Sequence, residues 1–187
     1  MSRRSVKIAY IGGGSKAWAR SFMQDLALAP DLAGEVALYD IDVPAAERNR
    51  IIGTKIQEKE AALSDFVYTV SATLEEALTG ADFVIISILP GTFTQMHTDV
   101  HAPEEYGILQ SVGDTVGPGG VFRALRTVPV YEGFAEAIRK SYTELDGLLE
   151  KMKAADLASL PEPERKPKCA SRQKCRYYHD CFPDEIR

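Results

Sequence analysis

The glycine-rich turn at residues 12–17 carries residue types suited to holding phosphates. It reads Gly-Gly-Gly-Ser-Lys-Ala and directly follows the apolar run 6–11. In the pattern Gly-x-Gly-x-x-Ala, the first glycine permits a tight turn and the second lets the backbone approach a pyrophosphate, while the small last residue allows the next helix to pack against the strand. The amides and positive dipole end of that helix attract phosphate oxygens. The spacing predicts a dinucleotide site, with contacts from Gly12, Gly13, Gly14 and Ser15.

A carboxylate at the end of the next apolar run is placed to hold a ribose. Asp40 closes the segment Leu-Tyr-Asp, after a predicted strand over 35–39. An acid there accepts from both ribose hydroxyls of NAD and repels the 2′-phosphate of NADP. The nicotinamide would reach towards residues 89–92, so Leu89 and Pro90 are predicted cofactor contacts. The alternative is an ordinary glycine turn, with Asp40 capping a loop.

A second block, residues 113–127, is rich in glycine and arginine. It reads Gly-Asp-Thr-Val-Gly-Pro-Gly-Gly-Val-Phe-Arg-Ala-Leu-Arg-Thr. Its glycines would let amides at the start of a helix face an anionic or hydroxyl-rich ligand, and Arg123 and Arg126 would add charge for the substrate. Asp114 would orient a ribose or sugar hydroxyl. The alternative for each arginine is a surface or interface salt bridge.

Apolar and amphipathic segments alternate around these groups. Strands are predicted over 6–11, 35–39, 66–70 and 83–88, and helices over 15–29, 44–62, 73–78 and 121–140. Continuous apolar strands separated by helices indicate an α/β fold, a Rossmann-like parallel sheet with helices on both faces. Residues 89–120 are expected to be an irregular, ligand-facing stretch, in which His97 and His101 are more typical of polar loop residues than of ligands.

The end of the chain differs from the rest. We expect a dinucleotide-binding domain over 1–140, an amphipathic helix over 141–160 and a basic, cysteine-containing tail over 161–187. Residues 165–187 hold seven Lys/Arg against three Asp/Glu, whereas the whole chain has a net charge of -5. Contact of this tail with nucleic acid is expected to be weak at most, because the acidic body opposes it.

The tail also holds all three cysteines. Cys169, Cys175, His179 and Cys181 provide four ligands within thirteen residues, the number that a tetrahedral zinc site requires. An odd, clustered set favours metal binding over disulfides. Three free thiols in a frayed tail are the alternative.

Composition places few other limits on function. With 45% apolar and 26% charged residues, the chain is ordinary for a soluble globular protein. No apolar run approaches the roughly 20 residues that cross a bilayer, and residues 1–7 lack the apolar stretch that would follow the basic start of a signal peptide. We therefore expect a cytoplasmic protein without a membrane partner.

Three segments resemble glycoside hydrolase family 4, and the resemblance covers residues 5–140. They are Lys-Ile-Ala-Tyr-Ile-Gly-Gly-Gly-Ser at 7–15, Leu-Tyr-Asp-Ile-Asp at 38–42, and the block from 113 to 129. Residues 87–93 and 99–108 are most similar to the α-galacturonidase branch, near the α-galactosidases.

The resemblance implies an enzyme that cleaves O-glycosides with NAD and a divalent metal, usually Mn²⁺. In that chemistry NAD⁺ takes a hydride from C3 of the sugar, the metal polarises the carbonyl, and a base removes the C2 proton. The aglycone then leaves by elimination, water adds and the hydride returns. The implied substrate is a small α-galacturonide or related α-glycoside. Met96 stands where phospho-sugar members carry an arginine, which agrees with an unphosphorylated sugar.

The sequence also departs from the family. The family's metal-binding Cys and His and its base lie beyond the matched region, so no catalytic residue is assigned and the active site is expected to be incomplete here. Residues 154–161 and 169–182 weakly resemble the iron-sulfur segment of DinG-type helicases, without its fourth cysteine. An iron-sulfur or zinc module and a plain NAD-dependent oxidoreductase stay as alternatives. Apolar surface around 128–134 would favour a homo-oligomer.

Overall fold

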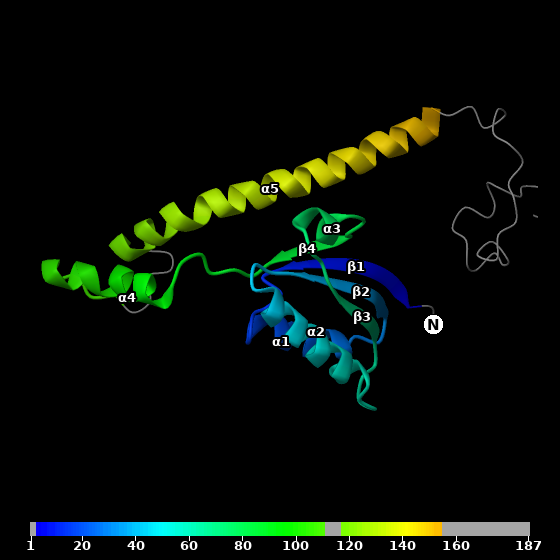
Figure 1. Ribbon diagram of the computed structural model, residues 1–187, viewed down its shortest axis with the longest axis horizontal. Helices are drawn as coiled ribbons and strands as arrows, with labels where there is room; N and C mark the ends of the chain where they lie inside the picture. Colours follow the sequence, from blue (N-terminus) through cyan, green and yellow to red (C-terminus); the bar gives the residue numbers. More distant parts are fainter. Residues whose placement is uncertain (1–2, 111–116, 155–187) are drawn as a thin grey trace, which may run out of the picture. The chain divides into compact units, whose positions relative to one another are not determined.

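The computed structural model describes residues 3–110 and 117–154, and one four-stranded sheet is its centre (Figure 1). The strands are β1 (Arg4–Ile11), β2 (Leu32–Tyr39), β3 (Asp65–Val70) and β4 (Phe83–Ile86). Their order is β3-β2-β1-β4, and every neighbouring pair is parallel. Central β1 places Ile8 between Val36 and Phe83. The predicted Rossmann-like parallel sheet is confirmed.

Helices follow the strands. They are α1 (Trp18–Ala27), α2 (Val43–Gln57), α3 (Leu74–Leu78), α4 (Phe93–His101) and α5 (Gly117–Ala154), with a 3-10 turn η1 (Ala102–Tyr106). Helices α2, α3 and α4 each begin at a residue whose side chain caps the helix. The Asp42 side chain accepts from the Ala45 amide at 3.0 Å to cap α2, and Thr73 does the same for α3. Such caps satisfy amides that have no partner inside the helix.

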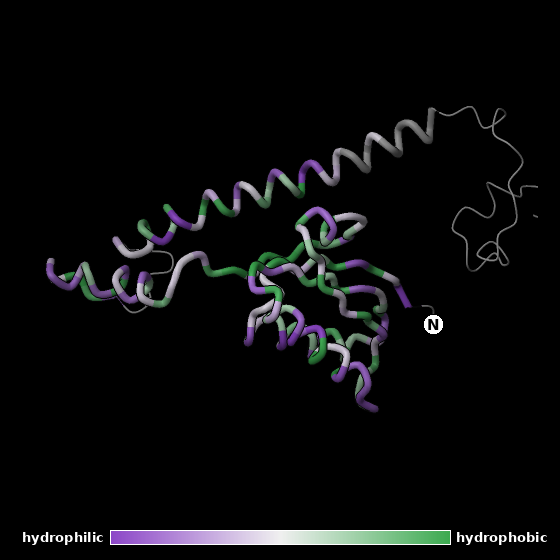
Figure 2. Tube along the Cα trace, in the orientation of Figure 1, coloured by the Kyte–Doolittle hydropathy of each residue, from purple (hydrophilic) through white to green (hydrophobic). Residues whose placement is uncertain are grey.

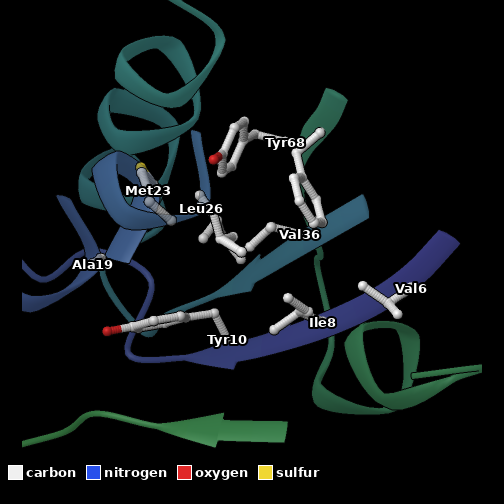
Figure 3. Packing of buried hydrophobic residues seen from close by; sticks show 11 residues of the cluster. Val6, Ile8, Tyr10, Ala19, Met23, Leu26, Val36 and Tyr68 are labelled. Atoms are coloured by element: carbon white, nitrogen blue, oxygen red, sulfur yellow. The ribbon is translucent and has the colours of Figure 1, made fainter. Parts of the chain in front are cut away.

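One face of the sheet packs on α1 and α2. Figure 3 shows Val6, Ile8 and Tyr10 of β1 directed to the same side as Val36 of β2, towards a cluster of apolar side chains on α1. That cluster consists of Ala19, Met23 and Leu26. The alternation of side chains along a strand sends every second residue of β1 into this layer.

The opposite face is covered by α3 and α5. Ala9 and Ala37 present small side chains there, which lets Leu78 of α3 and Ile138 of α5 pack closely. The Tyr142 hydroxyl of α5 donates to the Ala81 carbonyl at 3.2 Å. Figure 1 shows α1 and α2 together on one side of the sheet and α3 on the other, and Figure 2 shows hydrophobic residues along the strands. Helices on both faces are thus confirmed.

Helix α5 is longer than the sequence pattern predicted. A helix over 121–140 and a separate amphipathic segment after 144 were expected, but α5 runs unbroken from Gly117 to Ala154 and includes Pro129. Internal contacts divide the chain into a unit up to Thr143 and a unit from Glu144 onward. The expected domain limits, 1–140, 141–160 and 161–187, stay predictions, since residues 155–187, which include the whole third part, lie outside the described residues.

The expectation of an irregular stretch over residues 89–120 was wrong for part of it. Helix α4 forms there, followed by η1. The Gln95 amide donates to Thr92 Oγ1 at 3.2 Å, and the Thr92 amide donates to Gln95 Oε1 at 2.8 Å. This reciprocal capping box fixes the start of α4. Within the described ranges, no helix is both long and apolar enough to cross a membrane.

Candidate nucleotide site

The glycine turn lies between β1 and α1, packed against three other elements. A Cβ added to Gly12 would lie 2.0 Å from the Ser87 carbonyl oxygen, and Gly12 has a positive φ of +90°. Added Cβ atoms would lie 2.7 Å from Leu38 Cβ at Gly13 and 2.7 Å from Ala45 Cβ at Gly14. Three successive glycines are therefore required by close approach to β2, to α2 and to the residue after β4.

Asp40 is bonded to this turn. Its Oδ2 accepts from the Gly14 amide at 2.8 Å, and its Oδ1 accepts from the Asp42 amide at 2.9 Å. The Tyr39 carbonyl beside it accepts from the amides of Gly12 and Gly13. A carboxylate has about four acceptor positions, so two backbone donors leave room for ribose hydroxyls. Asp40 both closes the turn and stays available to a ligand.

Asn49 of α2 is a site residue that the sequence interpretation missed. Its side chain is fully buried, and its Nδ2 donates to the carbonyls of Gly13 at 2.7 Å and Ser15 at 2.8 Å. The signal was present in the sequence: Asn49 occupies the same helix face as Ala45 and Gly53, which are buried as well. A polar residue on a buried helix face requires hydrogen-bond partners.

A cleft of about 980 Å³ opens beside the turn, at the carboxyl edge of the sheet. Gly12, Gly14 and Ser15 line one part of it, Asp40 and the two following residues another, and residues after β4 a third. Trp18 of α1 also lines it with 74% of its surface exposed. Ligands of doubly wound α/β proteins bind at this edge.

An apolar hollow of about 320 Å³ adjoins the cleft. Ile41 and Leu89 border both spaces, whereas Pro90 borders only the hollow. Val130 and Phe134 of α5 complete its apolar wall. Leu89 and Pro90, predicted from the sequence as cofactor contacts, thus lie together at the sheet edge.

The two candidate arginines occupy different places on α5. Arg123 lines the cleft. Arg126 instead forms a bidentate ion pair with Asp99 of α4, with Nη1 and Oδ1 3.2 Å apart and Nη2 bonded to Oδ2. The hydrogen bonds that the guanidinium donates to Asp99 raise the pKa of Arg126. The salt-bridge alternative therefore describes the observed contacts of Arg126, while a substrate role for either arginine stays a prediction.

Two other sets of predicted residues cannot be located. Asp114, and the tail ligands Cys169, Cys175, His179 and Cys181, lie outside the described residues. Within the described part of the chain, no three His, Cys, Asp or Glu side chains are grouped to hold a metal ion. The His97 and His101 rings lie 4.3 Å apart on α4, and His101 Nδ1 is 2.8 Å from Glu104 Oε1. These described residues do not fit a manganese site.

Known proteins match both the sequence and the fold. The chain is 57% identical over 135 residues to an α-galacturonidase of Lachnoclostridium phytofermentans, covering 72% of this chain and 29% of that relative. It superposes on lplD of Bacillus subtilis with a TM-score of 0.67 at 51% identity, covering 75% of this chain and 31% of that one.

A more distant structure was solved with ligands. The 6-phospho-β-glucosidase of Thermotoga maritima, in a structure with manganese, NAD⁺ and glucose-6-phosphate, matches with a TM-score of 0.61 at 28% identity, covering 72% of this chain and 32% of that one. The chain spans about three tenths of the length of the curated relatives that it matches. A family model described as "Family 4 glycosyl hydrolase" matches residues 7–143, so the chain belongs to glycoside hydrolase family 4.

Proposed function

We propose that this chain binds NAD⁺ and forms the NAD-binding part of a family 4 glycosidase. The observation that carries the proposal is the glycine turn closed by Asp40 beside a 980 Å³ cleft at the carboxyl edge of a parallel sheet. Ligand clefts commonly have volumes of about 300–1,000 Å³, so the space suits a dinucleotide. Bound NAD⁺ would supply a hydride acceptor beside the sugar.

Each part of the cofactor has a matching group in the site. The pyrophosphate would lie over Gly12 and Gly14, which line the cleft. The ribose hydroxyls would donate to Asp40. The adenine, a flat apolar ring, would enter the hollow between Ile41 and Leu89. The nicotinamide half would extend into the remaining cleft, towards Thr92.

The substrate that we propose is an α-galacturonide or a related α-glycoside. Its support is the 57% identity to a protein named α-galacturonidase. A galacturonide carries a carboxylate, and Arg123 provides a positive charge at the cleft wall that would pair with it. The C3 oxidation and elimination expected of the family would need groups from outside the described residues.

A manganese ion is part of the same family expectation. Because the described residues do not form a metal site, we assign no step of the reaction to the metal in this chain. Zinc or an iron-sulfur cluster on the tail cysteines is a separate proposal, and metal analysis of the purified chain would detect either.

The test of NAD⁺ binding is calorimetric titration of the chain with NAD⁺ and NADP⁺. We expect NAD⁺ to bind in preference to NADP⁺, because Asp40 would repel the 2′-phosphate. Asp40→Asn removes that charge and should narrow the preference by about tenfold or more, a difference of about 1.4 kcal/mol. Quenching of Trp18, the chain's single tryptophan, gives an independent readout.

Asp42→Asn is the matched control. It removes a charge two residues away, and asparagine still caps α2 well. If Asp42→Asn changes the NAD⁺ to NADP⁺ preference as much as Asp40→Asn does, general charge and not ribose contact sets the preference. If neither dinucleotide binds the unaltered chain, the proposed function is wrong for this chain.

A further inference from the structure

The peptide that joins Gly13 to Gly14 is hydrogen-bonded at both of its ends. Its carbonyl oxygen, on Gly13, accepts from Asn49 Nδ2 at 2.7 Å. Its amide, on Gly14, donates to Asp40 Oδ2 at 2.8 Å. One side chain of α2 and one residue after β2 therefore fix the orientation of this single peptide plane.

Such a plane needs fixing because both of its flanking residues are glycines. Glycine adopts backbone conformations on both sides of φ = 0 with similar ease, so a Gly-Gly peptide can rotate and exchange the places of its C=O and N–H groups. Rotation would break both bonds and turn the carbonyl oxygen into the position of the amide. The Gly13 carbonyl oxygen would then face the Asp40 carboxylate and repel it, whereas the Gly14 amide attracts that carboxylate and holds it at the edge of the cleft.

Asn49 is suited to this task by its own environment. Its side chain is 0% exposed, and its amide makes three hydrogen bonds: two donated to the Gly13 and Ser15 carbonyls, and one accepted from Arg20 Nε at 3.0 Å. Carbonyls only accept, and the Arg20 guanidinium only donates, so the three partners leave one orientation for the amide. Burial strengthens such bonds and makes their loss costly.

We propose that Asn49 is a positioning residue of the nucleotide site, which holds the Gly13–Gly14 peptide in the orientation that donates to Asp40 Oδ2 and so fixes this carboxylate for the ribose; Asn49 is itself oriented by Arg20. The inference rests on the proposed binding of NAD⁺. Asn49 does not line the cleft, so its expected effect on the affinity for NAD⁺ is indirect.

Asn49→Ala and Arg20→Met test the inference in the full chain. Asn49→Ala removes both donors, and we expect NAD⁺ to bind at least about tenfold more weakly, as the loss of two hydrogen bonds to the site predicts. Arg20→Met leaves Asn49 in place but removes its orienting donor, so it should weaken binding less. Arg20 lies on the half-buried side of α1, and its variant is expected to fold even if Asn49→Ala does not.

Gly53→Ala is the control for simple destabilisation. Gly53 lies one turn further along α2, and a Cβ there would meet the ring of Tyr68 at 2.7 Å. This variant should lower the melting temperature without touching the glycine turn. If Asn49→Ala or Arg20→Met weakens NAD⁺ binding no more than Gly53→Ala does, the inference is overturned.

Amide exchange in the ligand-free chain separates this inference from the proposed function. We expect the Gly14 amide, protected by Asp40 in the unaltered chain, to exchange faster in Asn49→Ala than in Gly53→Ala. Equal exchange in the two variants would show that Asn49 does not hold the peptide, even if NAD⁺ binds. If the Gly14 amide exchanges faster in Asn49→Ala but the unaltered chain does not bind NAD⁺, Asn49 holds the peptide and the proposed function is wrong. The role of Asn49 in a nucleotide site would then be wrong as well.

Discussion

At the scale of single residues, the site depends on positions where no side chain fits. Gly12 combines a positive φ of +90° with a Cβ position 2.0 Å from the Ser87 carbonyl oxygen. Those two demands are independent, because the first concerns the backbone of Gly12 alone and the second concerns β4. The sequence motif predicts a glycine at position 12, and the structure shows that both the positive φ and the contact with Ser87 require it.

A comparison of Gly12→Ala with Gly80→Ala would separate the energetic cost of backbone strain from the cost of the clash with Ser87. Gly80 has a φ of +69° with nothing within 4 Å of an added Cβ, so its alanine variant should lose roughly 1–2 kcal/mol of unfolding free energy from backbone strain alone. Gly12→Ala should lose clearly more, because the clash with Ser87 adds to the strain. Urea unfolding measures both. Equal losses would mean that the end of β4 moves away freely.

At the scale of elements, the contact between α4 and α5 holds one wall of the cleft in place. Arg126 of α5 pairs with Asp99 of α4, and the Gln110 side chain donates to the Asp99 carbonyl at 2.8 Å. A Cβ on Gly119 would lie 2.3 Å from that same carbonyl oxygen. The first turns of α5 therefore sit directly on the last turn of α4, whose start contributes Phe93 to the cleft.

Asp99→Asn should loosen α4 without unfolding the sheet. It removes one charge and leaves the Arg126 guanidinium, 29% exposed, without its opposite charge. We expect faster hydrogen exchange over residues 93–101 and unchanged exchange in β1. Glu47→Gln is the comparison, because it breaks the more exposed Glu47–Arg50 pair on α2 and should alter exchange little. Unchanged exchange in α4 would mean that the Asp99–Arg126 pair does not hold this helix.

At the scale of the whole molecule, stability depends on a core that contains few ionisable groups. Tyr68 of β3 is one of them, 3% exposed, and its hydroxyl lies near the Gln57 side chain without forming a hydrogen bond of ordinary geometry. Burial raises the pKa of this hydroxyl, because the low dielectric disfavours the charged phenolate. The unfolded chain would ionise Tyr68 near its ordinary pKa of about 10.

The resulting pH dependence has a definite sign. Because the pKa of Tyr68 is higher in the folded state, its contribution to stability is fully present below about pH 10 and is lost as the pH rises through the folded value. Urea unfolding should therefore give a steeper loss of stability above pH 10 in the unaltered chain than in Tyr68→Phe. At pH 7 the phenylalanine variant should be as stable or more stable, since it removes a buried hydroxyl whose approach to Gln57 lacks ordinary hydrogen-bond geometry. Identical alkaline slopes would contradict this.

Self-association belongs to the same scale and stays a prediction. Val121, Phe122, Leu125 and Val128 of α5 are each at least half exposed. Three of them precede the 128–134 segment that the sequence suggested, and Val128 begins it. Within that segment, Tyr131 lines the cleft and Phe134 lines its apolar hollow.

Local sequence patterns were sufficient to predict the parallel sheet, the glycine turn and the position of Asp40. Each follows from spacing within one short segment: apolar runs that bury a strand, or glycines directly after it. The sequence was less informative where a glycine interrupted the pattern. Strand β2 begins at Leu32, ahead of the predicted residue 35. The sequence pattern missed this start because Gly34, which lies against the Val6 carbonyl, has no apolar side chain to extend the run.

The hydrogen-bond partners of the polar residues became known from the folded structure. Asn49 bonds to Gly13 across 36 positions, and Arg126 bonds to Asp99 across 27. Short-range periodicity carries no information about such pairs, because they depend on which helix faces meet after the sheet has formed. The physical reason is that a strand or turn is specified by its own backbone and side chains, whereas a buried polar group is specified by whichever partner the fold brings within hydrogen-bond distance.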